Sequence, residues 1–169
     1  MTVVEWHKGE NIMATQWTAG TTSGQVLTAA TLNTIGAAWE SWTPALTAST
    51  TNPNLGTTGT SVGRYARINK TIFGNATFTF NGTGIAAGTG FYFCSLPITA
   101  QGSGLTVGSV IAVDVSTFAS NAQLCQSDTV NRLIGVGTGG ASLAATLQAT
   151  TFAWAAGDFI RYNFCYEAA

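Results

Sequence analysis

Two stretches of the chain alternate apolar and polar side chains with a period of two, and this pattern limits most strongly what the chain can fold into. In residues 71–80 the polar positions are mostly threonine, Phe73 is the exception, and the apolar set is Ile72, Ala76, Phe78 and Phe80. In residues 159–166 the apolar set is Ile160, Tyr162, Phe164 and Tyr166, opposite Phe159, Arg161, Asn163 and Cys165. Because successive side chains point to opposite faces of a strand, both stretches predict strands of a sheet with one buried face.

Turn residues separate further short segments of β character. Clusters of Asn, Gly, Pro and Thr fall at 52–59, 69–70 and 81–84, and residues 69–70 are the connection of a predicted hairpin. The segments that resemble strands are 62–68, 71–80, 90–96, 109–115, 123–127, 132–136, 149–153 and 159–166. The pattern predicts a mainly-β domain over residues 44–169, a β-sandwich or jelly-roll of about eight to nine short antiparallel strands.

The preceding residues form two further predicted parts, an extended N-terminal arm over 1–27 and a short helix with its connector over 28–43. The hydroxyl of Thr28 suits the N-cap of a helix over residues 29–40. Leu32, Ile35 and Trp39 then form one apolar stripe, and Pro44 limits how far the helix extends. So short a helix is marginal alone, so we expect this stripe to be an oligomer contact or to dock on the domain.

The first 12 residues hold three of the charges, Glu5, Lys8 and Glu10, and His7, the only histidine. Two interpretations stay open for them. Either the start of the chain is placed too early, or these residues form a genuine peripheral arm.

Charged residues are scarce, and this excludes several classes of protein. Only 8% of the chain is charged, with six Lys or Arg and seven Asp or Glu, where about a quarter is usual. A net charge of −1 offers no basic field for nucleic acid, and 46% hydrophobic residues argue against disorder. Thr and Gly interrupt the uncharged stretches, so no membrane span is expected. The N-terminus lacks a positively charged region followed by an apolar one, so no secretory signal is expected either. Edge strands are normally protected by charged side chains, which are scarce here. We therefore expect the edges of the sheet to be covered by further copies of the chain in a symmetric oligomer.

The residues that carry chemistry do not form a recognisable active site. Residues 135–140 match G-x-G-x-x-G but lack the surrounding βαβ unit, so we interpret them as a glycine-rich loop. The carboxylates form no metal-binding motif, and Asp158 after Gly157 is expected to be a turn residue. A spatial pair of carboxylates, as in a glycosidase, stays open. Cys94, Cys125 and Cys165 are expected to be reduced and mostly buried. We therefore predict no catalytic, cofactor-binding or metal-binding residues, and no cofactor.

Half of the cationic side chains lie within seven residues, as Arg64, Arg67 and Lys70. On a strand Arg64 and Arg67 point to opposite faces, so the three do not form one phosphate-binding stripe. We expect them to make salt bridges or partner contacts, with anion binding as the lesser alternative.

Several segments together give the chain a family resemblance. It is similar to small virion proteins of tailed bacteriophages, especially those of actinobacterial hosts, which are described as minor tail, tail-fibre-tip or head-fibre proteins. The segments that carry the resemblance are QVLTAATLN at 25–33, WESWTPAL at 39–46, GRYARINKTI at 63–72, SLP at 95–97, and GDF at 157–159 with the ending YEAA at 166–169. Asn69 stands where a glycine is expected, and residues 1–12 lie outside the pattern.

The resemblance implies a non-enzymatic, trimeric structural protein on the virion exterior, made in the host cytoplasm. As a minor tail or fibre-tip protein it would attach to host surface glycans through loops such as 81–90 or 101–108. The alternative is a capsid decoration protein, or head fibre, whose N-terminal arm grips and stabilises the shell. A polysaccharide depolymerase is a third and disfavoured alternative. The expected partners are further copies of the chain, other virion proteins of tail or capsid, and host glycans, without nucleic acid or membrane insertion.

Overall fold

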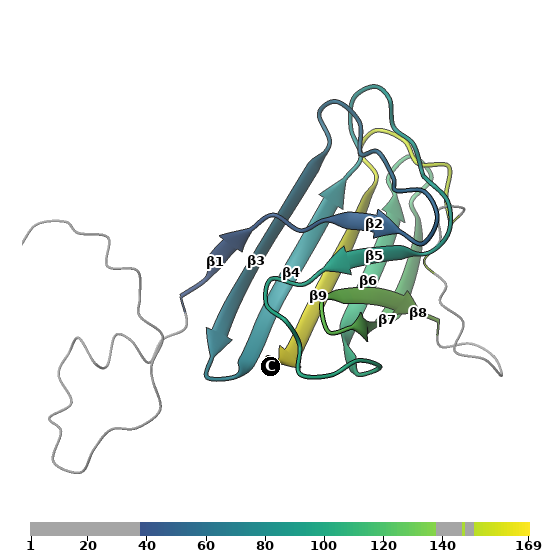
Figure 1. Ribbon diagram of the computed structural model, residues 1–169. Coiled ribbons are helices and arrows are strands. Elements are labelled where there is room, and N and C mark those ends of the chain that lie inside the picture. Colours follow the sequence, from purple (N-terminus) through teal and green to yellow (C-terminus); the bar gives the residue numbers. More distant parts are fainter. Residues whose placement is uncertain (1–37, 138–146, 148–150) are drawn as a thin grey trace, which may run out of the picture.

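The computed structural model describes residues 38–137, 147 and 151–169, and within them it contains nine β-strands and no helix (Figure 1). All pairings are antiparallel, and the strands form one sheet in the order β1-β3-β4-β9-β6-β7-β8-β5-β2. The mainly-β, antiparallel prediction is confirmed. The strands are β1 (Glu40–Trp42), β2 (Leu46–Ala48), β3 (Thr60–Ile68), β4 (Thr71–Thr79), β5 (Tyr92–Ser95), β6 (Thr106–Asp114), β7 (Ala119–Thr129), β8 (Arg132–Val136) and β9 (Phe159–Glu167).

The sheet curls until its two outermost strands approach each other. β1 and β2 lie at opposite ends of the strand order, yet only residues 43–45 separate them in the sequence. In Figure 1, β2, β5 and β8 cross in front of the longer strands β4, β9 and β6. The hydroxyl of Ser61 on β3 donates a hydrogen bond to the carbonyl oxygen of Pro44, which fixes this connection against the sheet. The curl places the apolar core between the crossing strands.

The period-two prediction for β4 and β9 is confirmed, because both apolar sets are buried. Phe78 and Tyr162 meet in the core with ring centroids 6.2 Å apart, edge to face. Phe80 stacks on Trp154 at 4.5 Å. Strand registers pair Phe78 with Ile160 and Ala76 with Tyr162, so the buried positions of the two strands lie on the same face.

The predicted hairpin at Asn69-Lys70 joins β3 to β4. Asn69 has a φ of 55°, a left-handed conformation that asparagine tolerates better than most residues other than glycine. This explains how the turn forms with asparagine at a position where glycine was expected.

Three details of the strand and helix predictions are wrong. Residues 38–42 contain no helix, because residues 40–42 pair with β3 instead; the rest of the predicted helix, with Leu32 and Ile35, lies outside the described residues, as does the arm. β1 and β2 were missed, since three residues are too few to show alternation. Of the segment 149–153, residues 151–153 form no strand.

The three cysteines are free, and two of them are buried in the core. Burial raises the pKa of the Cys125 thiol to about 12, so this side chain acts as a small apolar group. Cys165, by contrast, is exposed on the outer face of β9, so the expectation of burial holds for Cys94 and Cys125 alone.

Candidate interaction site

The outer face of β4, β9 and β6 carries an open groove of about 400 Å³, which we call the open-face groove. It is lined by residues of β9 and of its two neighbours β4 and β6, together with Trp39, which precedes β1. Among the residues that the structure describes, no charged side chain lines it. The lining residues are Trp39, Phe73, Gly74, Asn75, Val107, Gly108, Ser109, Asn163, Phe164 and Cys165.

Strand register places three uncharged polar side chains in one row across this groove. Asn75 of β4 pairs with Asn163 of β9, which pairs in turn with Ser109 of β6. Within the part of the chain that the structure describes, none of these three side chains makes a hydrogen bond. The amide and hydroxyl groups are therefore available to a ligand or partner.

The next row along the strands is apolar. Phe73 pairs with Cys165, and both face the groove. A register shift between Thr106 and Gly108 interrupts the β6–β7 pairing here and places Val107 beside them. Phe73, the exception in the alternating pattern, is thus an aromatic side wall of the groove.

Two glycines leave room for neighbouring atoms of β9 at the groove. A Cβ atom at Gly74 would collide with the ring of Phe164, and one at Gly108 would collide with the carbonyl oxygen of Asn163. Both residues pair with Phe164. The absence of side chains there lets Phe164 lie beneath the groove.

Exposed apolar side chains surround the groove on the same face of the sheet. Trp39 is half exposed, and the Arg64 guanidinium lies 5.8 Å from its ring centroid. Three further exposed apolar side chains, Val62, Ile68 and Leu124, lie on this face. The strand register shows this, because they pair with the outward-facing residues Thr77, Thr71 and Ser109 respectively. Large apolar side chains gathered on one side of a sheet are typical of a surface covered by a partner.

The structure separates the three cationic residues that the sequence singled out. Arg64 shares the outer face with Asn75, whereas Arg67 pairs with the core residue Ile72, so the prediction of opposite faces is confirmed. The Arg67 Nε donates to the carbonyl oxygen of Asn69 at 2.6 Å, and Lys70 is exposed in the hairpin. Across residues 38–137, 147 and 151–169 none of the three forms an ion pair. Their role as partner contacts stays a prediction.

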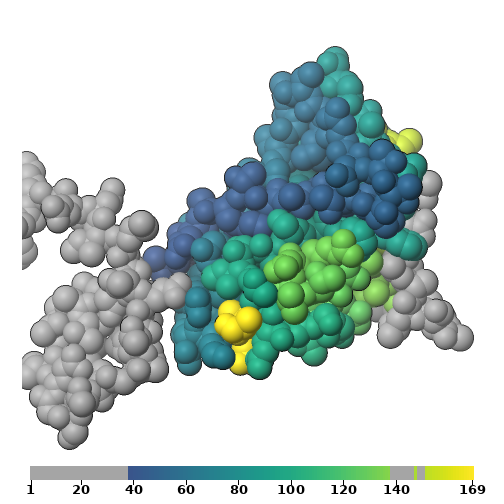
Figure 2. All heavy atoms as spheres, in the orientation of Figure 1, coloured from purple at the N-terminus to yellow at the C-terminus, as the bar shows by residue number. Residues whose placement is uncertain are grey.

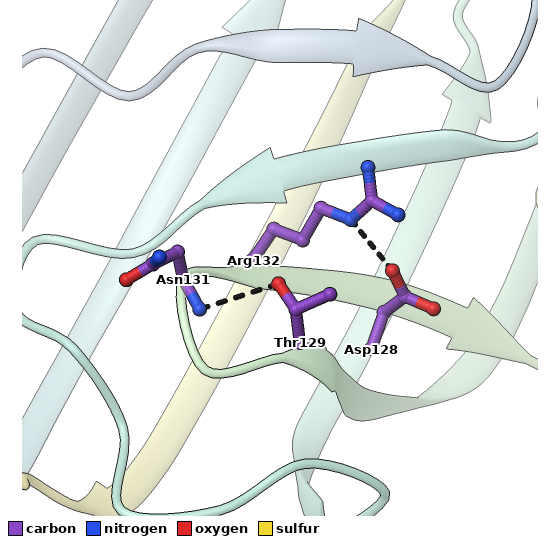
Figure 3. A network of polar contacts seen from close by, with 4 residues as sticks. All are labelled: Asp128, Thr129, Asn131 and Arg132. Atoms are coloured by element: carbon purple, nitrogen blue, oxygen red, sulfur yellow. Dashed lines mark hydrogen bonds and ion pairs between the residues drawn. The ribbon is translucent and has the colours of Figure 1, made fainter.

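Within the described part of the chain, an ion pair joins Arg132 of β8 to Asp128 of β7 (Figure 3). Arg132 Nε lies 2.6 Å from the Asp128 carboxylate, and its guanidinium lies 3.9 Å from the Phe93 ring centroid. In the same turn the Asn131 amide donates to the Thr129 hydroxyl at 3.3 Å. These contacts hold the β7–β8 hairpin together and connect it to β5.

A second surface feature is the turn between β6 and β7, residues 115–118, which we call the β6–β7 tip. One carboxylate oxygen of Asp114 accepts hydrogen bonds from the Ser116 amide, the Ser116 hydroxyl and the Thr117 amide, at 2.9, 2.7 and 3.1 Å. These bonds, the Ser116 hydroxyl foremost, lower the pKa of Asp114. Asp158, fully buried, accepts from the Val115 amide at 2.9 Å and from the Ala155 amide at 2.7 Å.

The β6–β7 tip ends in an exposed aromatic ring. Phe118 is 87% exposed and has a φ of 57°, and Val115 beside Asp114 is 42% exposed. A bulky residue such as phenylalanine rarely adopts this left-handed backbone conformation, so Phe118 is a genuine outlier. This residue was not predicted from the sequence, although an aspartate followed two and three residues later by serine and threonine signals a capped turn.

The two loops proposed for attachment lie at opposite ends of the sheet. Loop 81–90 pairs with loop 51–59 through the bridges Thr51–Thr89 and Asn54–Ala86, and Thr57 and Thr83 lie side by side. We call residues 54–58 and 81–86 the loop ridge; Figures 1 and 2 show these loops projecting together from the body. Loop 101–108 lies by the end of β9, because the Gln101 amide donates to the Glu167 carbonyl at 2.8 Å.

Some of the sequence features that were considered for enzymatic roles lie in the described part of the chain. Asp158 opens β9 as expected for a turn residue, and both of its carboxylate oxygens accept backbone hydrogen bonds. Gly135 and Val136 of the glycine motif belong to β8, while residues 138–140 and His7 lie outside the described residues. Among the residues that the structure describes, no three His, Cys, Asp or Glu side chains gather as metal ligands.

Comparison with known proteins returns no relative. The chain matches no family model, no curated protein and no solved structure. In the described ranges no helix is long and apolar enough to cross a membrane.

Proposed function

We propose that the chain is a non-enzymatic structural protein on the exterior of a tailed-phage virion, trimeric and of the minor tail or fibre-tip type. The observation that carries the proposal is the set of apolar side chains exposed on one face of the sheet around the open-face groove. A protein that acts alone rarely leaves such a set uncovered. A virion component is covered by its own copies and its neighbours. The virion and its tail come from the resemblance of the sequence.

We also propose that the curled sheet is a β-sandwich of jelly-roll type. The support is the crossing of β2, β5 and β8 over the longer strands, with the core between them (Figure 1). Sandwiches of this kind present loops at both ends while the core holds the loops in place. Attachment sites on virion exteriors need that arrangement.

Host attachment is assigned to the loop ridge. Its exposed groups are hydroxyls and amides, from residues such as Thr57, Thr58, Asn81 and Thr83, and these suit neutral glycan hydroxyls. Each contact of this kind is weak. Three copies in one trimer would raise the apparent affinity by about 10²–10⁴ through multivalency.

The deciding experiment is the position of the chain in the assembled virion, determined by electron cryomicroscopy with antibody labelling. Density at the tail tip, with adsorption to host cells lost in virions that lack the protein, supports the proposal. Density on the capsid surface, with normal adsorption and a fragile shell, identifies the alternative, a capsid decoration protein. A chain absent from the particle overturns both.

A further inference from the structure

We propose that the β6–β7 tip of one copy inserts into the open-face groove of a second copy, so that the chain assembles head to tail. The inference rests on the assembly proposed above and names the two surfaces that form its interface. Its occupant is a second copy because this chain carries both complementary features, the groove over the first residues of β6 and the tip directly after its last residue.

The tip is built as a rigid projection. Asp158 holds the Val115 amide, Asp114 holds the Ser116 and Thr117 amides, and the Thr117 hydroxyl accepts from the Ala119 amide at 3.4 Å. A turn fixed at so many points loses little conformational freedom on binding. Rigidity of this kind suits insertion into a shaped protein surface.

The ring at the end of the tip is not explained by packing inside its own chain. Phe118 is almost wholly exposed and adopts a strained left-handed conformation that glycine or asparagine adopts more easily. Backbone strain at an exposed position is grounds for a functional hypothesis. We infer that the ring is kept for a contact outside the chain.

The groove offers what the tip requires. The exposed apolar part of its lining, formed by Phe73 and Cys165, can receive the ring of Phe118 and the methyls of Val115. Its polar half presents Asn75 and Asn163, whose amides have no partner in the described part of the chain.

The tip in turn presents acceptors for those amides. Among the described residues the carbonyl oxygens of Ser116 and Thr117 accept no hydrogen bond. Insertion would therefore satisfy groups on both surfaces. It buries no ionised side chain of the described groove lining, because the lining residues in ranges 38–137 and 151–169 are uncharged.

The positions of the two surfaces decide the symmetry. The groove includes Gly108 and Ser109 near the start of β6, and the tip follows Asp114 at its end. Two different patches make a head-to-tail contact, which closes into a ring or continues as a filament. A closed ring of three agrees with the expected trimer. Val62, Ile68 and Leu124 are exposed on the same face of the sheet as the groove.

The test is sedimentation velocity on the full chain and three variants. Phe118→Asn removes the ring and tolerates the left-handed backbone, and Phe73→Thr removes the side wall of the groove while favouring a strand. Leu105→Asn is the matched control, since Leu105 is 51% exposed and belongs to neither surface. We expect the wild type and Leu105→Asn to be oligomeric, and Phe118→Asn and Phe73→Thr to associate at least tenfold more weakly. Unchanged thermal midpoints would show that the variants are folded.

Mixing the two weakened variants gives the sharpest result. The Phe73→Thr chain retains an intact tip and the Phe118→Asn chain retains an intact groove, so an equimolar mixture should form heterodimers that neither variant forms alone. A wild type that stays monomeric at about 100 µM, a concentration well above the Kd of specific complexes, overturns both this inference and the proposed assembly. A Phe118→Asn chain that assembles like wild type, or a mixture without heterodimers, overturns the tip-and-groove contact and leaves the proposed virion role standing.

Discussion

The hydroxyl of Tyr65 on β3 donates a hydrogen bond of 2.6 Å to the Glu40 carboxylate on β1. This bond joins the strand at one end of the sheet to its neighbour at the point where the chain enters the fold. The Glu40 carboxylate, chiefly through this bond, raises the pKa of Tyr65 to about 12.

Replacing Glu40 with Gln should therefore lower the pKa of Tyr65 toward the usual value of about 10. The pKa of Tyr65 is higher in the folded chain than in the unfolded chain. The hydrogen bond to Glu40 therefore contributes fully to stability below the unfolded pKa of Tyr65, and this contribution is lost as the pH rises through the folded pKa. Tyrosine titration by NMR, with Tyr65→Phe to assign the signal, measures this. Glu167→Gln is the control, and an unchanged Tyr65 pKa in Glu40→Gln would contradict the prediction.

Asp158→Ala should be strongly destabilising. The substitution removes the fully buried Asp158 carboxylate and leaves the Val115 and Ala155 amides without their acceptor, which costs about 3 kcal/mol of unfolding free energy. Asp128→Ala is the comparison, because its ion pair is partly exposed and should contribute less than about 1 kcal/mol. Urea unfolding measures both. Equal effects would show that Asp158 does not hold the tip and the turn before β9.

The carboxylate of Asp114 should make the stability of the fold sensitive to acid. Its pKa is lowered in the folded chain by hydrogen bonds from Ser116 and Thr117, so its contribution is present above the unfolded pKa of about 4 and is lost as pH falls through the folded value. Asp114→Asn should flatten the dependence of the urea midpoint on pH in this acid range. A variant with the same acid dependence as wild type would contradict the assignment.

Gly74→Ala should destabilise the sheet by about 1–3 kcal/mol, because the added Cβ meets the ring of Phe164. Gly102→Ala is the matched control, since the nearest side-chain atom lies 3.6 Å from the new Cβ. Its effect should stay within about 0.5 kcal/mol. Thermal unfolding followed by circular dichroism compares the two, and equal midpoints would mean that Phe164 moves aside without cost.

Much of the sheet could be predicted because its long strands carry their own pattern. Alternation in β4 and β9 identifies the buried face of each, and the Asn69-Lys70 turn joins β3 to β4 as expected. The prediction failed at residues 40–42, where a helical spacing of apolar residues suggested a helix end. Pairing with β3 outweighs so weak a local preference.

The candidate site was visible only in part. Phe73 was marked as an exception to alternation, and the structure makes it a side wall of the groove. Asn75 and Asn163 gave no signal, because 88 residues separate them and only the β4–β9 register pairs them. The same is true of Phe118, whose exposure and backbone conformation depend on how Asp114 and Asp158 hold the turn.

The sequence by itself determined the class of fold, the buried faces of the long strands and the scarcity of charge, since these follow from side-chain periodicity and composition. Tertiary structure alone decided the strand order, the closure of β1 toward β2, and the meeting of uncharged amides with an aromatic side wall on one open face. The physical reason is that local patterns specify which side of a strand is apolar. Which strands become neighbours depends on packing between residues far apart in the chain.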